Sequence, residues 1–328
     1  MSFSFRTELN IKPNARLLSL QTPVLTAGSC FAEVMGRKIQ QYKVPSLVNP
    51  FGTIFNPLSL NHLLTASLQP QHEFTGELLQ RDGLWLAYDF HSSFAAASRT
   101  ELLTLIRNTF RQTQQFIIKA DTLILTFGTA VGYIHRTSNQ LVANCHKVPQ
   151  QQFRKTLVSM ADITASFSNF HQILKQLNPN IRLILTVSPV RHVKETLEGN
   201  SVSKSILRVA CHELSERYPD VHYFPAYELL LDDLRDYRFY QEDMIHPNAV
   251  AEGYIWEKFK AAYCDEAFTR FTAEWDKIQQ ALTHRPFHPD APGHQEFLRK
   301  TLSQLEKLRH LVDCEPEIAL VKKQILIS

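Results

Sequence analysis

Hydrophobic positions in this chain form two patterns: short, fully apolar runs and longer stretches with helical spacing. The first apolar run, Val24–Ala27, is opened by Pro23 and closed by Gly28. Apolar residues then recur three or four positions apart, as in one face of a helix: Phe31, Val34, Met35, Ile39 and Tyr42. This change of period predicts that Ser29 lies where a buried strand turns into a helix.

The place of Ser29 allows two interpretations. The first backbone N–H groups of a helix lack intrahelical partners and point at any anion nearby, which suits a nucleophile. Gly28 has no Cβ and permits both a tight turn and a close approach by substrate. However, serine is also a favoured N-cap, so Ser29 can be explained by helix capping alone.

The same alternation continues along the chain. Apolar runs at 121–128, 181–187 and 221–224 predict strands that are buried on both faces. Helices are predicted from about Arg99, from a cap at Asp162, and over about Ser203–Arg217. The apolar face of the last helix is assigned to Ile206, Val209 and Leu214. Strands that alternate with helices favour a mainly parallel sheet with helices on both faces. We therefore expect an α/β fold with three layers, α/β/α.

Shorter signals add detail to this plan. Leu47–Asn56 is predicted to be a loop, and Asn56 followed by Pro57 is a helix start signal. Ser98 and Glu101 have the spacing of a capping box. Two apolar-rich runs flank Arg81-Asp82-Gly83, which predicts an inserted β-hairpin.

From about Asp265 the pattern becomes purely helical. Two amphipathic stretches, Glu266–Leu282 and Gln295–Val312, are joined by a proline-rich linker, Thr283–Gly293. We expect an α/β domain over residues 1–264 and a helical C-terminal extension over residues 265–328.

Composition excludes several classes of function. The 328 residues are 44% hydrophobic and 20% charged, with a net charge of +3 and no basic run, which argues against nucleic-acid or membrane-surface partners. The five cysteines form no CxxC pair. No signal-peptide core and no apolar stretch of about 18 residues is present, so a cytoplasmic location is expected. We expect no cofactor and no metal, because His284, His288 and His294 lie in a proline-rich linker without regular geometry.

Ser29, Gly128 and Ser188 all follow predicted strands, and ligands bind beyond the carboxyl ends of such strands. Near the end of the α/β part, Asp243 precedes His246 by three residues in the turn before a helix that begins at Pro247. The carboxylate can then bind one imidazole nitrogen and leave the other as a general base. By itself a structural turn explains this pattern equally well. Together with Ser29 it gives a candidate triad.

On these residues the chain resembles the GSCFA family, which takes its name from Gly28-Ser29-Cys30-Phe31-Ala32 and is itself similar to the SGNH (GDSL-type) hydrolases. The resemblance covers roughly Leu18 to Cys264. The motifs that carry it, in family order, are Pro50–Pro57, Thr126–Ala130, Asn144–Pro149, Val187–Arg191 and Asp243–Asn248.

The resemblance implies a flavodoxin-like sheet and a triad of Ser29 as nucleophile, His246 as base and Asp243 as its partner. It also implies an oxyanion site made by the backbone N–H groups of Ser29 and Gly52. SGNH enzymes add an asparagine after a glycine, but this chain has Gly128-Thr129-Ala130. Thr129 or Asn144 takes that place, or the site uses two donors.

Other residues carry competing interpretations. Cys30 is an alternative nucleophile, because a helix N-terminus lowers a thiol pKa, although we expect its side chain to point into the core. His146 either lines the cleft or is a structural histidine. Arg191 and His192 either contact an anionic or sugar-like substrate or belong to a solvated loop.

The sequence thus leads to a cytoplasmic serine hydrolase that acts on a small-molecule or carbohydrate ester, with an O-acylated carbohydrate as a candidate. Acyl transfer by the same triad is an alternative. The missing asparagine supports a third reading, a ligand-binding module that has lost turnover.

Overall fold

The computed structural model describes residues 7–69 and 73–325. Contacts divide the chain into two compact units. Of the described residues, the first unit comprises those in 7–11, 23–38 and 46–258, and the second comprises those in 12–22, 39–45 and 259–325. No helix in the described part is both long and apolar enough to cross a membrane.

The first unit is built on a five-stranded sheet in which every pair of neighbours is parallel. Its strands, in spatial order, are β11 (Val221–Tyr223), β10 (Arg182–Val187), β6 (Thr122–Phe127), β1 (Val24–Gly28) and β2 (Ser46–Val48). Numbered along the chain this is the order 2-1-3-4-5, which places the switch of winding direction between β1 and β6. The expected α/β fold with a mainly parallel sheet is confirmed.

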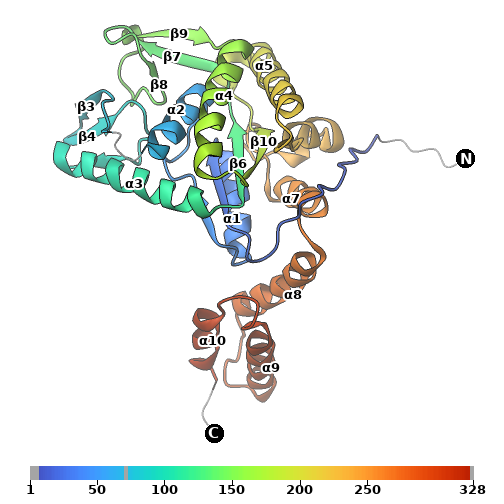
Figure 1. Ribbon diagram of the computed structural model, residues 1–328. Helices are drawn as coiled ribbons and strands as arrows, with labels where there is room; N and C mark the ends of the chain where they lie inside the picture. Colours follow the sequence, from blue (N-terminus) through green and yellow to red (C-terminus); the bar gives the residue numbers. More distant parts are fainter. Residues whose placement is uncertain (1–6, 70–72, 326–328) are drawn as a thin grey trace, which may run out of the picture. The chain divides into compact units, whose positions relative to one another are not determined.

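Helices cover both faces of this sheet (Figure 1). On one face, side chains such as Leu25, Leu125 and Leu185 join one core with four helices, α2 (Pro57–Leu68), α3 (Arg99–Lys119), α4 (Met160–Leu177) and α5 (Thr196–Arg217). The other face carries α1 (Cys30–Gln41). There a Cβ on Gly36 would lie 2.6 Å from Thr26 Oγ1, so this helix approaches β1 closely.

Two small antiparallel sheets flank the main one, β3-β4-β5 and β8-β7-β9. The predicted hairpin is confirmed as β3 (Leu78–Arg81) and β4 (Leu84–Ala87), and its turn residues Asp82 and Gly83 both have positive φ. The remaining strands are β5 (Ala95–Ala96), β7 (Val131–His135), β8 (Leu141–Val142) and β9 (Phe153–Leu157).

Helix starts at Pro57 and Arg99 are confirmed with their caps, Asn56 and the capping box of Ser98. Other boundaries were wrong. The cap of α4 is Ser159, and Asp162 is its capping-box partner three residues later. The edge strand β2 includes Leu47 and Val48, which the sequence assigned to a loop. Helix α5 begins at Thr196 rather than near Ser203.

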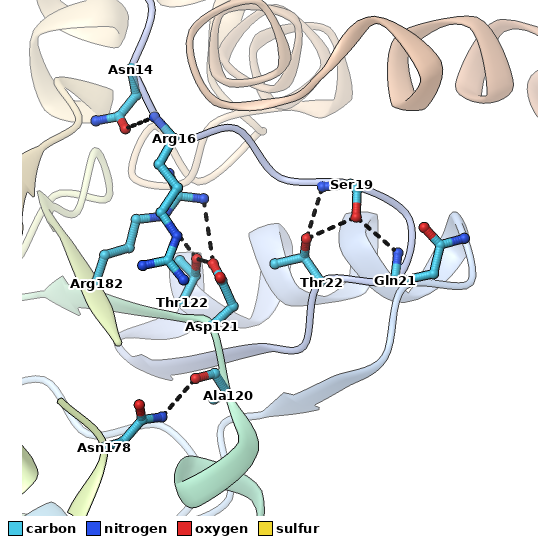
Figure 2. A network of polar contacts seen from close by, with 10 residues as sticks. All are labelled: Asn14, Arg16, Ser19, Gln21, Thr22, Ala120, Asp121, Thr122, Asn178 and Arg182. Atoms are coloured by element: carbon cyan, nitrogen blue, oxygen red, sulfur yellow. Dashed lines mark hydrogen bonds and ion pairs between the residues drawn. The ribbon is translucent and has the colours of Figure 1, made fainter. Parts of the chain in front are cut away.

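A polar network ties the amino ends of β6 and β10 together (Figure 2). Because the strands are parallel and Ser29 follows the carboxyl end of β1, this network lies at the opposite end of the sheet from Ser29. Arg182, only 2% exposed, donates from Nε to Thr122 Oγ1 at 2.9 Å. The Thr122 hydroxyl in turn donates to Asp121 Oδ1 at 2.8 Å, while Asn178 donates to the carbonyl oxygen of Ala120 at 2.7 Å. The Arg182–Thr122 bond thus joins the first residues of the neighbouring strands β10 and β6, at the end of the sheet that carries no candidate chemistry.

The second unit is helical, as the sequence predicts from about Asp265. It contains α8 (Glu266–Thr283) and α9 (Pro292–Leu308), together with a short helix that the pattern did not reveal, α10 (Glu315–Lys322). Trp275 is fully buried and donates from Nε1 to the carbonyl oxygen of Gln41 at 2.7 Å. The residues 39–45 therefore belong to the core of this unit.

The turn between β1 and α1 generates a prediction about stability. Gly28 has φ +133°, and a Cβ there would lie 2.1 Å from the carbonyl oxygen of Thr126. Gly28→Ala is expected to lower the free energy of unfolding by about 3 kcal/mol or more, because backbone must move. Gly253→Ala is the matched control: nothing lies within 4 Å of that Cβ, and a helical alanine should add about 0.5–1 kcal/mol. Urea denaturation measures both, and a Gly28→Ala variant as stable as wild type contradicts the assigned geometry.

Candidate active site at the carboxyl end of the sheet

Ser29 lies at the end of β1, in the turn that leads into α1. It is 1% exposed, and its Oγ accepts a hydrogen bond from the backbone N–H of Phe31 at 3.3 Å. Ser29 therefore does cap the helix. A capping hydroxyl uses a lone pair and keeps its own proton, so capping leaves a role as nucleophile open.

Asn49, which the sequence did not single out, holds this turn from the end of β2. Its Oδ1 accepts from the N–H of Gly28 at 3.0 Å, and its Nδ2 is 3.5 Å from the carbonyl oxygen of Ser29. Asn49 has φ +41°, a conformation that asparagine adopts more easily than most residues. An asparagine before Pro50 was the available signal, but nothing local shows that its side chain reaches back to β1.

The groups expected to bind an oxyanion already have partners inside the protein. The N–H of Ser29 donates to the carbonyl oxygen of Thr126 at 2.9 Å, and the N–H of Gly52 donates to that of Asn49 at 2.8 Å. The Thr129 hydroxyl lies 3.0 Å from Ser203 Oγ and accepts from the N–H of Val131. In this structure neither N–H is free for an oxyanion.

Asp243 and His246 form a close pair in the loop before α7 (Ala249–Tyr263). His246 Nδ1 is 2.6 Å from Asp243 Oδ2, while Asp243 Oδ1 accepts the N–H groups of His246 and Ile245 at 3.0 and 2.9 Å. These bonds, the His246 N–H first, lower the pKa of Asp243 to about 2. The carboxylate thus fixes the Nδ1–H tautomer, and His246 Nε2 makes no hydrogen bond to any residue that the structure describes.

Helix α7, which follows the histidine loop, lies within electrostatic reach of the carboxyl-terminal half of α1. Glu252 in α7 is close enough to Lys38, His246 and Arg37 for each of their charges to lower its pKa, against the larger effect of burial, which raises it. Within the described residues no hydrogen bond joins Ser29 to His246. Of the three residues expected to form a triad, Asp243 and His246 are therefore in contact, while Ser29 lies apart in the turn before α1.

Lys204 is a buried residue at this end of the sheet that sequence reasoning missed. It is 1% exposed, and its Nζ donates to the carbonyl oxygens of Gly128 and Ser188, both at 2.7 Å. Burial lowers the pKa of Lys204 to about 7, and the nearby Cys30 thiol opposes this effect. One ammonium group thus ties together the carboxyl ends of β6 and β10.

The pattern could have revealed this lysine. The buried face of α5 contains residues at helical spacing, namely Asn200, Ser203, Lys204, Leu207, Ala210, Cys211 and Leu214. The sequence interpretation placed Val209 on the apolar face, but that side chain is 52% exposed. The face assigned from Ile206, Val209 and Leu214 did not include Lys204.

The other candidates take varied places. Cys30 is partly exposed and lies near Lys204, so it does not simply point into the core; burial raises the pKa of its thiol and disfavours the thiolate. His146 is 5% exposed and its Nε2 is 2.8 Å from the carbonyl oxygen of Ala87. Asn144 Oδ1 accepts the N–H of His146 at 2.9 Å. These contacts hold Asn144 and His146 beside the hairpin.

Arg191 and His192 follow β10. The guanidinium of Arg191 donates to the carbonyl oxygen of Met244, in the loop that bears His246. His192 is partly buried, with its ring centroid 6.0 Å from that of Phe55. Neither residue belongs to a freely solvated loop.

Metal ligands do not cluster in the described part of the chain: no group of three or more His, Cys, Asp or Glu side chains could hold an ion there. Of the linker histidines, His284 and His294 lie 6.1 Å apart between ring centroids, and both contact Phe297.

Comparison with known proteins gives two matches to family models. Residues 23–259 match the GSCFA family, and residues 275–327 match a model described as the C-terminal domain of GSCFA domain proteins. No curated protein matches the chain. The first match covers the whole parallel sheet and every candidate catalytic residue.

The burial of Lys204 predicts a pH dependence of stability. Because its folded pKa of about 7 lies below the ordinary 10.5, the unfolded chain binds more protons between these values. Wild-type stability should therefore rise with pH across this window, relative to Lys204→Met, by up to about 1.4 kcal/mol per pH unit. Urea denaturation from pH 7 to pH 10 measures this difference, and parallel pH profiles for the two proteins would show that Lys204 stays charged.

Proposed function

The chain belongs to the GSCFA family, and from this premise and the site geometry we propose that it is a serine hydrolase acting on an ester. Ser29 is the nucleophile, His246 the general base and Asp243 its orienting partner. The observation that carries the proposal is the Asp243–His246 pair, because its 2.6 Å contact leaves Nε2 without a partner in the described structure. A small-molecule or O-acylated carbohydrate ester is the substrate class we expect.

The reaction proceeds in two halves. Ser29 Oγ attacks the acyl carbon while its proton passes to His246 Nε2, and the imidazolium gives this proton to the departing alcohol. Water then loses a proton to Nε2 and attacks the acyl group on Ser29, which releases the acid and restores the enzyme. Catalytic hydrogen bonds are often long in the absence of substrate, so a Ser29–His246 contact is expected to form on binding.

A second function, a ligand-binding module without turnover, is favoured by the state of the oxyanion groups. The N–H groups of Ser29 and Gly52 donate to carbonyl oxygens, and Thr129 is engaged with Ser203. For hydrolysis one of these donors has to exchange its partner for the oxyanion, at a cost to the reaction. Acyl transfer uses the same triad and differs only in the second half of the reaction, in which a hydroxyl acceptor attacks the acyl-enzyme in place of water.

A fluorophosphonate probe tests the proposal directly. Wild type is expected to be labelled, Ser29→Ala not at all, and His246→Ala at least about 100-fold more slowly, because the base is lost. The matched controls are Ser93→Ala and His62→Ala. Ser93 is an exposed serine bound to His91, and His62 is an exposed histidine 4.0 Å from Asp89. Both should label at the wild-type rate.

Three outcomes would count against the proposed serine hydrolase. An unlabelled but folded wild type that still binds an acylated sugar supports the binding module. Labelling that survives Ser29→Ala but disappears in Cys30→Ala assigns the nucleophile to the thiol. Faster consumption of a p-nitrophenyl ester when an alcohol is added, with formation of a new ester, indicates transfer rather than hydrolysis.

The role of Asp243 makes a separate prediction. In Asp243→Asn the side-chain oxygen can still accept the N–H groups of Ile245 and His246, but the amide donates to Nδ1 and moves the proton to Nε2. Turnover of a p-nitrophenyl ester should fall by about 10³ to 10⁴, because the base carries the wrong tautomer. Asp313→Asn is the control, since Asp313 Oδ1 likewise accepts a backbone N–H, that of Glu315. Equal rates for wild type and Asp243→Asn would remove Asp243 from the mechanism.

A further inference from the structure

The residue that joins the histidine loop to the parallel sheet is Arg191. It follows β10 after a short turn that is fixed at both ends: the N–H of Ser188 donates to the carbonyl oxygen of Phe127 at 2.9 Å, and the N–H of Val190 lies 3.3 Å from Ser188 Oγ. The backbone at Arg191 is therefore anchored to the sheet.

Arg191 makes two hydrogen bonds to the loop, both to carbonyl oxygens directly before His246. Its N–H donates to the carbonyl oxygen of Ile245 at 3.2 Å, and its Nη1 donates to that of Met244 at 3.1 Å. Met244 has φ +57°, which a non-glycine residue adopts only when its surroundings hold it there. Asp243 accepts hydrogen bonds from the backbone N–H groups of this turn, and Arg191 donates to its carbonyl oxygens, so the two residues stabilise the turn together.

The guanidinium is itself held by two tyrosines. Its carbon lies 4.1 Å from the ring centroid of Tyr240 and 5.0 Å from that of Tyr237. A planar, delocalised cation stacks on aromatic faces and presents several donors in a fixed fork, whereas the ammonium of lysine does neither. The geometry therefore requires arginine in particular.

The loop is closed upon itself on its other side. The N–H of Gln241 donates to the carbonyl oxygen of His246 at 2.8 Å, and Gln241 Nε2 donates to that of Pro247 at 3.0 Å. These bonds give the loop an internal shape. The bonds of Gln241 lie within the loop, whereas the bonds of Arg191 connect the loop to the end of β10.

We propose that Arg191 is a positioning residue, which holds the loop so that His246 faces the carboxyl end of the sheet where Ser29 lies. This inference rests on the proposed hydrolase function and changes the role of Arg191, since its guanidinium is directed to Met244 and two tyrosine rings rather than to a substrate. Its effect on chemistry passes through His246.

The test compares Arg191→Met and Arg191→Lys with a matched control, Arg208→Met. Arg208 also stacks on a tyrosine, 4.0 Å from the centroid of Tyr223, and pairs with Glu228 at 2.8 Å. With a p-nitrophenyl ester, Arg191→Met should lower kcat by about 10- to 100-fold and leave KM within about threefold, because misplacing a base costs rate rather than binding. Arg191→Lys should fall between Arg191→Met and wild type, and Arg208→Met should retain wild-type kcat.

Amide hydrogen exchange provides a readout that does not depend on turnover. The N–H groups of Ile245 and His246, which donate to Asp243, should exchange faster in Arg191→Met and not in Arg208→Met. Unchanged exchange at these amides overturns the inference, whether or not the protein hydrolyses esters. A raised KM with unchanged kcat overturns it as well, since Arg191 would then bind substrate. If the fluorophosphonate does not label wild type but these amides still exchange faster in Arg191→Met, the positioning role of Arg191 stands and only the hydrolase is rejected.

Discussion

The close approach of β1 to β6 at Gly28 is the constraint on which the candidate site depends. A side chain at this position would collide with the carbonyl oxygen of Thr126, so only glycine lets β1 end where it does. The next residue, Ser29, then uses its N–H to extend the ladder to Thr126 and its hydroxyl to cap α1. Because the order of strands places β1 beside β6 at the switch of winding direction, this turn lies at the edge where ligands of doubly wound sheets bind.

This arrangement has a cost for chemistry. The N–H that should meet an oxyanion is part of the strand pairing, and Gly52 N–H closes a turn with Asn49. Meanwhile the carbonyl oxygens of Gly128 and Ser188 face a buried ammonium group on Lys204. The lysine side chain that lies near Cys30 has a pKa that burial brings down to about 7, while the backbone N–H groups of Ser29 and Gly52 are used in folding. In the proposed mechanism, folding and stabilisation of the oxyanion would therefore compete for the same backbone N–H groups.

The sequence predicts what is local and periodic. Apolar runs place β1, β6, β10 and β11, and caps such as Asn56 and Ser98 place helix starts, because each depends on neighbours within a few residues. The Asp243–His246 pair was predictable for the same reason: three residues in a turn suffice to join them. Asn49, Lys204 and Arg191 act on partners that are distant in the chain, so local spacing could not assign their contacts. Strand β9 was not predicted, because most of its residues are exposed and polar. The buried face of α5 was assigned wrongly, because it contains a lysine and a serine.

In the proposed mechanism the Ser29 hydroxyl carries the acyl group during turnover. This step is tested most directly by quenching the reaction with p-nitrophenyl acetate in acid and locating the adduct by peptide mass spectrometry. One acetyl group is expected on the peptide that contains Gly28-Ser29-Cys30, with fragment ions assigning it to Ser29. An acetyl group on Cys30, or turnover without any acylated peptide, would contradict this mechanism.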